Sequence, residues 1–407
     1  MTDSSLAYFF TAASLTVIGF SGHLLLLRAL KQPLYLPLAL CLAAVAVLIC
    51  QPVLKTLAPF LQLYFLLFSL PALYLIPPCF WLYVQGITSI TRGARWHFNK
   101  SHRKHFLLSA VAVGIVICTL LLPKELQQGL LVEGNEQVLQ HSPPMLRNFV
   151  YVLLIATFLL VMGWVLQAAF YIYAVFRALK LYREQLKQVF ASTEAQEGRW
   201  INWILTAVTG LWLLLAGILL YDNLIAPVHI QTALKDALIL VLLWSIAVWG
   251  LRQKPGFAEL DQKDVVSQET LLLLSEPKYQ RSALDDDMAD NIIQKLQRAM
   301  VQDQRYLDAS LSLPKLAKHI FVSPNYVSQT LNQKLGVNFF DYVNSYRVHA
   351  AKEQLRRSND TVLDIAMNVG FNAKSSFYTA FQKDTGYTPS QYRKISRLSA
   401  KPTAGTE

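Results

Sequence analysis

The sequence predicts an all-α protein with two unlike parts, a polytopic seven-helix membrane bundle followed by a soluble helical domain. Three observations predict this. Seven apolar stretches, each long enough to cross a bilayer, occupy the first 254 of the 407 residues. From about residue 290 the apolar residues recur with the roughly 3.6-residue period of soluble amphipathic helices. Within that second region, two segments match each other at an offset of 49 to 50 residues.

The seven apolar stretches are expected to form a transmembrane domain over residues 1–254. Each reaches the roughly 17–25 residues that a helix needs to cross a hydrocarbon core of about 30 Å. No basic residue precedes the first stretch and no small-x-small cleavage site is found, so we expect a retained span rather than a removed signal peptide. The stretches lie near residues 6–27, 34–54, 60–88, 105–122, 148–176, 201–220 and 233–250.

Basic residues are shared unevenly between the loops that join these stretches. One alternate set of loops carries 14 Lys and Arg residues, whereas the opposite set carries three, Lys55, Lys124 and Arg147. Because Lys- and Arg-rich loops stay in the cytoplasm, the N-terminus is expected outside and the C-terminus inside. An odd number of spans is what this orientation requires.

Four ionisable residues lie around the outer ends of the sixth and seventh stretches. Ionisable groups at membrane depth are candidates for function, so we take these as signal-sensing candidates, with plain solvation at the interface as the alternative. They are Asp222, His229, Lys235 and Asp236. The four cysteines all lie in apolar runs without metal-ligand spacing and are expected as small core residues. No catalytic dyad or phosphate-binding loop is found, so we expect neither an enzyme nor a cofactor or metal site.

Residues 255–287 are expected to form an acidic cytoplasmic linker. They hold eight acidic and three basic residues, so they repel both DNA and anionic lipid. A flexible chain of this length has a root-mean-square reach of about 30 Å. The linker would therefore keep the following domain, residues 288–397, close to the membrane. A disordered tail is expected at 398–407.

The soluble domain contains an internal repeat. "LAKHIFVS" (316–323) aligns with "IAMNVGFN" (365–372), and four further pairs follow fifty residues apart. The four pairs are Val327 with Phe377, Leu331 with Phe381, Gly336 with Gly386, and Tyr342 with Tyr392. Each repeat is expected to be a helix, a tight turn and a second helix, with Gly370 supplying the turn in the second repeat. One long helix over 338–357 would join the two repeats.

Capping residues mark where the helices of this domain begin. Ser312, Ser323, Thr361 and Thr388 each stand where a side-chain oxygen can accept from a free amide in the first turn. Thr361 with Asp364, and Thr388 with Gln391, have the spacing of a capping box. Each of these four residues is therefore expected to be an N-cap.

The outward face of the second helix in each repeat is polar and free of carboxylates. A face that enters the major groove must avoid anions and offer hydrogen-bonding groups to base edges. Two helical hairpins that merely pack together would not need this pattern on both faces. Residues 288–407 also carry 16 basic and 9 acidic residues, which favours an anionic partner. The candidates for base contact are Asn325, Ser328, Gln329, Asn332, Lys374, Ser375, Tyr378 and Thr379.

Residues 290–395 resemble the AraC/XylS-type DNA-binding domain, in which a central helix joins two helix-turn-helix units. The resemblance is strongest in "DIAMNVGFNAKSSFYTAFQKDTGYTPSQYRK" (364–394). It implies a bacterial transcription regulator with recognition helices at 324–335 and 374–384, which would read two major-groove segments roughly 10 bp apart. This sequence has no arginine on either outward face, so Asn325 and Gln329 are expected to favour adenine.

Double-stranded DNA and the lipid bilayer are therefore the expected partners, and the bacterial inner membrane is the expected location. A homodimer is compatible with this reading, but the sequence shows no dimer seam. The signal, whether small molecule, lipid or membrane protein, stays open. So do two alternatives, a bundle that only anchors the domain and a transporter or membrane enzyme with a regulatory tail. Candidates for phosphate contact are Ser323, Arg347, Lys352, Arg356, Arg357, Thr361, Lys383 and Arg393.

Overall fold

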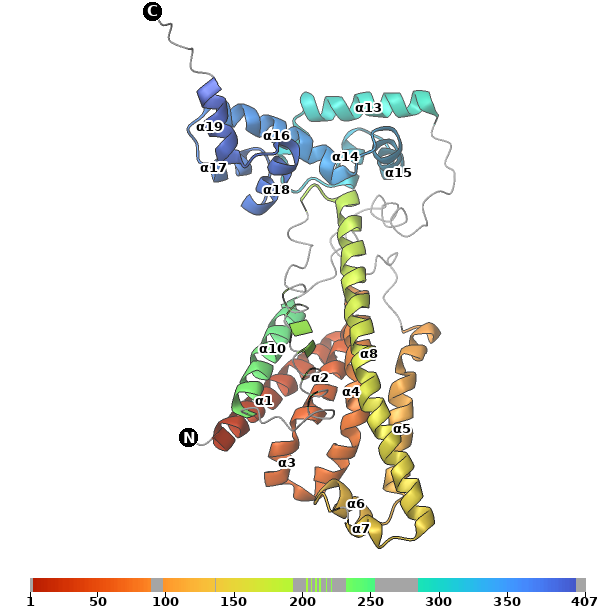
Figure 1. Cartoon of the computed structure of the whole chain (residues 1–407). Helices are drawn as coiled ribbons and strands as arrows, with labels where there is room; N and C mark the ends of the chain where they lie inside the picture. The colour runs from red at the N-terminus through yellow and green to blue at the C-terminus, as the bar shows by residue number, and fades with distance from the viewer. Residues whose placement is uncertain are drawn as a thin grey trace, which may run out of the picture. The chain divides into compact units, whose positions relative to one another are not determined.

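The computed structural model describes residues 3–88, 98–135, 137–192, 232–252 and 285–399, together with isolated positions between 203 and 221. Over this part of the chain the regular structure is helical, apart from an isolated antiparallel bridge between Phe190 and Ser312. The chain divides into two compact units, whose helices are labelled in Figure 1. Unit 1 comprises residues 1–89, 95–179 and 200–255, and unit 2 comprises residues 90–94, 180–199 and 256–407.

Unit 1 is built from long apolar helices. Within it α2 packs against α4, and α1 packs against α10. Leu38, Leu42, Leu82 and Ile87 are buried in its main core. Its helices are α1 (Asp3–Ala29), α2 (Leu36–Ile49), α3 (Gln51–Leu57), α4 (Gln62–Thr88), α5 (Leu107–Leu120), α6 (Lys124–Leu131), α7 (Gln137–Gln140), α10 (Thr232–Arg252) and the part of α8 (Pro144–Val189) that precedes residue 180, with 3-10 turns η1 (Pro33–Tyr35), η2 (Pro59–Leu61) and η3 (Lys100–Phe106).

Five described helices are long and apolar enough to cross a membrane. They cover Ser5–Ala29, Pro59–Thr88, Lys100–Leu120, Pro144–Val189 and Ala233–Arg252. The stretch expected at 34–54 is divided into α2 and α3, which are bent by 59° and count as a sixth span only if taken together. Pro52, in the first turn of α3, lacks the amide that would continue the hydrogen-bond pattern of α2. Most of the stretch expected at 201–220 lies outside the described residues, so the structure establishes five candidate spans and not seven.

Unit 2 holds the two repeats that the sequence predicts. The first repeat is α14 (Leu313–His319), α15 (Pro324–Gln329) and the π-helical turn η5 (Thr330–Lys334). The second repeat is α17 (Val362–Asn368) and α18 (Lys374–Thr385). The remaining elements are α13 (Asp286–Val301), the 3-10 turn η4 (Arg305–Leu307), the joining helix α16 (Phe339–Arg357) and α19 (Pro389–Ser399). The last helix therefore extends two residues into the predicted tail, whose remaining residues are not described.

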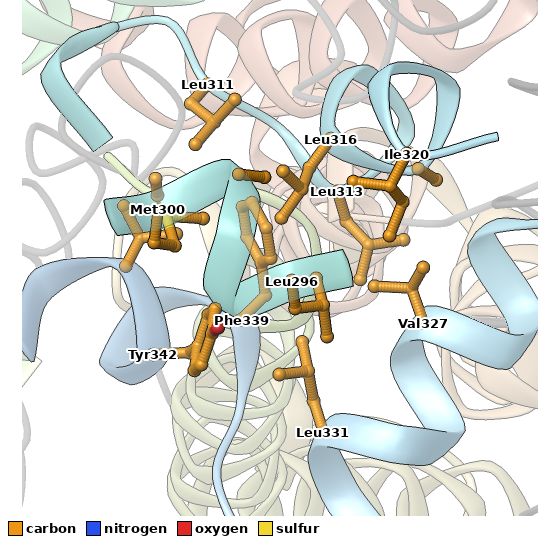
Figure 2. Packing of buried hydrophobic residues seen from close by; sticks show 14 of the residues in the cluster. Leu296, Met300, Leu311, Leu313, Leu316, Ile320, Val327, Leu331, Phe339 and Tyr342 are labelled. Atoms are coloured by element: carbon orange, nitrogen blue, oxygen red, sulfur yellow. The ribbon is translucent and has the colours of Figure 1, made fainter. Parts of the chain in front are cut away.

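Each repeat has its own hydrophobic core. Leu296, Leu316, Val327 and Leu331 converge in the first core, as Figure 2 shows, and Val327 and Leu331 are fully buried. Phe377 and Phe381 occupy the matching places in the second core and are also fully buried. Helix α16 contributes Phe339, Tyr342 and Val343 to the first core and Val348, Ala351 and Leu355 to the second. It thereby holds the two recognition helices in one compact unit.

The turns of the two repeats are equivalent. Gly370 has a φ of 94°, and the residue that aligns with it, Phe321, has a φ of 54°. The amide after each turn donates a 3.0 Å hydrogen bond to the carbonyl of Ala317 or Ala366. Gly336 and Gly386, which also align, have φ values of 66° and 76°. The repeat is thus a repeat of backbone geometry as well as of sequence, although the first repeat places a phenylalanine in a conformation that favours glycine.

Three of the four predicted N-caps form the expected hydrogen bond. Ser323 Oγ accepts from the amide of Tyr326, and Thr361 Oγ1 accepts from the amide of Asp364. Thr388 and Gln391 exchange hydrogen bonds as a capping box. The prediction for Ser312 was wrong in this respect, because its side chain makes no capping bond. Ser312 is instead buried where it pairs with Phe190.

Candidate nucleic-acid interface

The two predicted recognition faces differ in exposure. On α18 the side chains of Lys374, Ser375 and Thr379 are exposed, and Tyr378 is half-buried. Of the predicted base-contact residues on α15 and η5, Asn332 is exposed, whereas Asn325, Ser328 and Gln329 are half-buried. Both helices are seated by their buried apolar residues, which fixes the direction in which these polar groups point. The second face is therefore open, and the first is partly covered.

Local contacts already orient several of these side chains. The Lys374 ammonium lies 5.3 Å from the ring centroid of Tyr378, a cation–π distance. Thr379 Oγ1 donates to the carbonyl of Ser375 at 3.0 Å. Asn332 Nδ2 lies 2.9 Å from the carbonyl oxygen of Ser328 and 3.1 Å from Oε1 of Gln188, a residue of α8. Gln329 Oε1 is buried and has no hydrogen-bond partner among the described residues.

The predicted phosphate contacts on the surface are engaged with other groups of unit 2. Arg357, with a side chain 83% exposed, lies 3.3 Å from the carboxylate of Glu353. Lys383 lies 2.8 Å from the carboxylate of Asp341, and Lys352 is paired with Asp384. Arg356 bonds the hydroxyl of Tyr392 and the carboxylate of Glu353, and Arg393 donates to the carbonyl of Asp360 at 2.7 Å. Exposed ion pairs contribute only about 0–1 kcal/mol, so a phosphate can replace these partners at little cost.

The structure corrects the prediction that Arg347 contacts a DNA phosphate from the protein surface. Its side chain is fully buried. Nε donates to the carbonyl of Tyr306 at 2.8 Å, and Nη2 donates to the carbonyl of Asp308 at 2.9 Å. Nη1 bonds the carbonyl of Ala191, the hydroxyl of Ser192 and the amide oxygen of Asn344 at 3.1 to 3.2 Å. The guanidinium is therefore occupied inside unit 2, where no phosphate reaches it.

The loop that Arg347 holds also contacts the second repeat. A Cβ at Gly370 would lie 2.5 Å from the carbonyl oxygen of Tyr306, so only glycine fits there. Asn372 donates to the carbonyl of Ala309 at 3.1 Å. In the same loop burial raises the pKa of Asp308, but hydrogen bonds from Ser310 and the charges of Lys315 and Arg305 more than offset it and leave that pKa below its ordinary value. Residues 305–310 thus connect the first core to the turn of the second repeat.

The part of α8 from residue 180 onward belongs to unit 2, which the sequence reasoning missed. Tyr182, Leu186 and Val189 are buried at helical spacing, and Ala191 lies in the core of the first repeat. The apolar period of the fifth stretch continues through these residues, and that continuation was the signal available in the sequence. The charged residues between them, which include Arg183 and Lys187, marked the segment as a loop instead.

Two of the four signal-sensing candidates lie in the described part of unit 1. Asp236, on α10, is buried, and its carboxylate lies 3.3 Å from the hydroxyl of Thr11 on α1 and 3.6 Å from the Lys235 ammonium. Asp222 and His229 lie outside the described residues. Within the described part of the chain, no three His, Cys, Asp or Glu residues are grouped to hold a metal ion.

Comparisons with known proteins concern the C-terminal part of the chain. A family model described as "Helix-turn-helix domain" matches residues 316–395. The chain is 32% identical over 111 residues to the uncharacterized HTH-type transcriptional regulator YtdP of Bacillus subtilis, covering 27% of this chain and 14% of that one. It is 30% identical over 90 residues to the melibiose operon regulatory protein of Escherichia coli, covering 22% of this chain and 30% of that one. It is 36% identical over 88 residues to the bifunctional transcriptional activator/DNA repair enzyme AdaA of Bacillus subtilis, covering 22% and 42%.

Among solved structures, the C-terminal domain of AraT, a response regulator from Geobacillus stearothermophilus, is 28% identical. The match covers 31% of this chain and 95% of that one, with a TM-score of 0.24. The match spans less than half the length of each curated relative named above. Its C-terminal part carries an AraC-type helix-turn-helix domain, and its homologues are transcription regulators.

Proposed function

We propose that this chain, whose C-terminal helix-turn-helix domain has transcription regulators as homologues, is a membrane-embedded bacterial regulator that binds double-stranded DNA sequence-specifically. One observation carries the proposal. Two equivalent repeats, each with its own core, are held by the single helix α16, and each presents a polar recognition helix. A protein built only to pack two hairpins together would not need equivalent polar faces at equivalent positions.

The proposed roles of the side chains follow from their chemistry. Asn and Gln side chains can bond two groups on an adenine edge, which is the role we assign to Asn325 and Gln329. Lys374 and Thr379 would contact bases from the exposed face of α18. Arg356, Arg357, Lys383 and Arg393 would exchange their present partners for phosphates and fix the register, as would the amides at the helix starts behind Ser323 and Thr361. No catalytic step is assigned to the chain.

Selection of binding sites from a random pool of DNA duplexes tests this function. The full chain would be held in lipid nanodiscs and would bind the pool at moderate salt. The recovered DNA would then be sequenced. We expect an enriched site of two blocks whose centres lie roughly 10 bp apart, because the two recognition helices face one side of the duplex. Recovery of DNA without any enriched sequence would leave only nonspecific binding and would contradict the proposal.

The proposed location is the bacterial inner membrane, with unit 1 as the embedded part. Five described helices have the length and composition of spans. The excess of 14 basic residues over three in alternate loops supports an N-terminus outside and unit 2 in the cytoplasm. Single cysteines placed at Lys31 and Lys55, in a background without the native cysteines, would test the orientation. A membrane-impermeant thiol reagent applied to intact cells should label the second position and spare the first.

The residue that we assign to signal detection is Asp236, which is buried between α10 and α1. A buried carboxylate held by a hydroxyl from another helix is a group whose contacts change if α1 and α10 move. The test measures the transcriptional response, which is the change in the transcripts of regulated genes when cells are exposed to compounds that act on the membrane. If unit 1 only anchors the DNA-binding domain, Asp236→Asn should leave this response unchanged. We expect that response to be lost, whereas Glu125→Gln, at an exposed position of unit 1, should preserve it.

A further inference from the structure

The end of α8 carries a buried apolar face, and Ala191, two residues after the helix, lies in the core of the first repeat. Leu186 is fully buried, Val189 is 1% exposed, and Tyr182 lies one turn before Leu186 on the same side. All three belong to unit 2, so these contacts are internal to the unit that carries the recognition helices. Burial of two aliphatic side chains contributes about 1.5–3 kcal/mol each. The segment is therefore held in place and does not merely lie nearby.

Backbone pairing continues where the helix stops. Phe190 pairs with Ser312 in an antiparallel bridge, and the amide of Ala191 donates to the carbonyl of Leu311 at 3.1 Å. The carbonyl of Ala191 and the hydroxyl of Ser192 then accept from Arg347. The segment thus bonds the loop before α14 and the helix that joins the two repeats. These are the elements that position the first recognition helix.

The same segment also contacts the recognition face itself. Gln188 Oε1 lies 3.1 Å from Nδ2 of Asn332, the one exposed member of the predicted base-contact set in the first repeat. The other three members are half-buried, whereas three of the four on α18 are exposed. An amide that bonds Gln188 is not available to a base edge. Among the predicted base-contact residues, the hydrogen bond from α8 therefore falls on the first repeat, at Asn332.

We propose that residues 186–192 form a latch that competes with DNA for the first repeat. This inference rests on the proposed function. In the latched state the chain reads DNA with the second repeat, and in the released state it reads with both. The helix that ends in the latch begins at Pro144 in unit 1, so the latch is covalently continuous with an apolar helix of that unit. Displacement of that helix by a signal would strengthen or weaken the contacts between residues 186–192 and the first repeat.

A disulfide at the antiparallel bridge tests whether release is needed. Paired residues in an antiparallel bridge have Cα atoms about 4.5–5.5 Å apart. A disulfide spans Cα separations of about 4.4–6.8 Å, so Phe190→Cys with Ser312→Cys can cross-link the latch. The full chain would carry Cys118→Ser in all variants, because Cys118 is the one native cysteine that is not buried. Binding to the selected two-block site would be measured in nanodiscs before and after reduction.

We expect the oxidised double variant to bind the two-block site about tenfold more weakly than the reduced one, with full recovery on reduction. Each single cysteine variant should be insensitive to reduction. Equal affinity of the oxidised and reduced forms would overturn the latch while leaving the proposed function intact. Absence of selective binding by every form, wild type included, would overturn the proposed function and the latch with it.

Removal of the side-chain contact gives an independent test that does not disturb the core. Gln188→Ala leaves Leu186 and Val189 in place and removes the α8 contact from Asn332, so we expect binding to the two-block site to tighten about two- to fivefold. Gln185→Ala, on the same helix without that contact, is the matched control and should leave the affinity unchanged. A Gln188→Ala variant with the affinity of wild type contradicts a competition for Asn332.

Discussion

The guanidinium of Arg347 donates a 3.1 Å hydrogen bond to the carbonyl oxygen of Ala191, a residue 156 positions earlier in the chain. The two residues belong to different parts of the sequence, the helix that joins the repeats and the end of a long apolar helix. Their bond places residues 186–192 inside the folded unit that carries the recognition helices. The DNA-binding unit is therefore larger than the segment that resembles other regulators.

Arg347→Met should destabilise unit 2 strongly. The substitution removes the five hydrogen bonds of the guanidinium and leaves the buried carbonyl of Ala191 without this donor, and a buried unpaired group costs about 1–3 kcal/mol. We expect a loss of about 3 kcal/mol or more in the free energy of unfolding, measured by hydrogen exchange of the α16 amides. Arg357→Met, at an exposed position, is the control and should change that free energy by less than about 0.5 kcal/mol. Equal effects of the two substitutions would contradict a buried role for Arg347.

Gly370→Ala should cost more than Gly386→Ala. Both glycines have a positive φ, so both substitutions strain the backbone by about 1 kcal/mol or more. Only at Gly370 does the added Cβ also meet the carbonyl oxygen of Tyr306, at 2.5 Å, because nothing lies within 4 Å at Gly386. The two variants would be compared by thermal unfolding of the full chain in nanodiscs, with near-ultraviolet circular dichroism as the signal that monitors unfolding. A smaller loss at Gly370 than at Gly386 would show that the loop of residues 305–310 does not press on this turn.

Thr361→Ala and Ser312→Ala separate a capping residue from one that only occupies the capping position. The Thr361 hydroxyl accepts from the amide of Asp364 at 3.1 Å, so its loss should cost about 1 kcal/mol. Ser312 makes no capping bond, and its replacement should cost clearly less. Hydrogen exchange of the amides in the first turns of α17 and α14 would measure both effects. A cost at Ser312 as large as that at Thr361 would be inconsistent with the structure.

Gln329→Ala and Arg357→Ala should weaken DNA binding in different ways. Loss of a base contact relaxes the preference at one position of the site, whereas loss of a phosphate contact weakens binding to all sequences. For Arg357→Ala we expect the slope of log affinity against log salt concentration to fall in magnitude by about one. Fluorescence anisotropy titrations on the selected site and on single-base variants, at several salt concentrations, would measure both quantities. If Gln329→Ala keeps the full preference at every position, Gln329 does not read a base.

Much of unit 2 could be predicted from the sequence because its signals are local. The repeat spacing, the cap at Thr361 and the glycine turn at Gly370 each depend on residues close together in the chain. The burial of Arg347 could not be predicted in this way, since its partners come from Ala191 and Tyr306, far away in sequence. An arginine in a basic helix is ordinarily exposed, and only the tertiary fold shows otherwise.

The candidate site was predicted less completely than the fold. The polar faces of α15 and α18 follow from helical periodicity, but the difference in their exposure has no signal in the local sequence. The contact between Gln188 and Asn332 joins two exposed amides and has no signature in the sequence. In unit 1, composition located the apolar stretches, while the bend between Ile49 and Gln51 divided one that had been expected as a single helix.

Hydroxyl-radical footprinting of the selected DNA site by the full chain in nanodiscs tests the central claim most directly. Two equivalent recognition helices joined by α16 should protect two segments on one face of the duplex, with centres roughly 10 bp apart. Under reducing conditions the Phe190→Cys and Ser312→Cys variant should protect both segments, and after oxidation it should protect the one read by α18. Uniform protection, or none at moderate salt, would contradict sequence-specific binding by the two repeats.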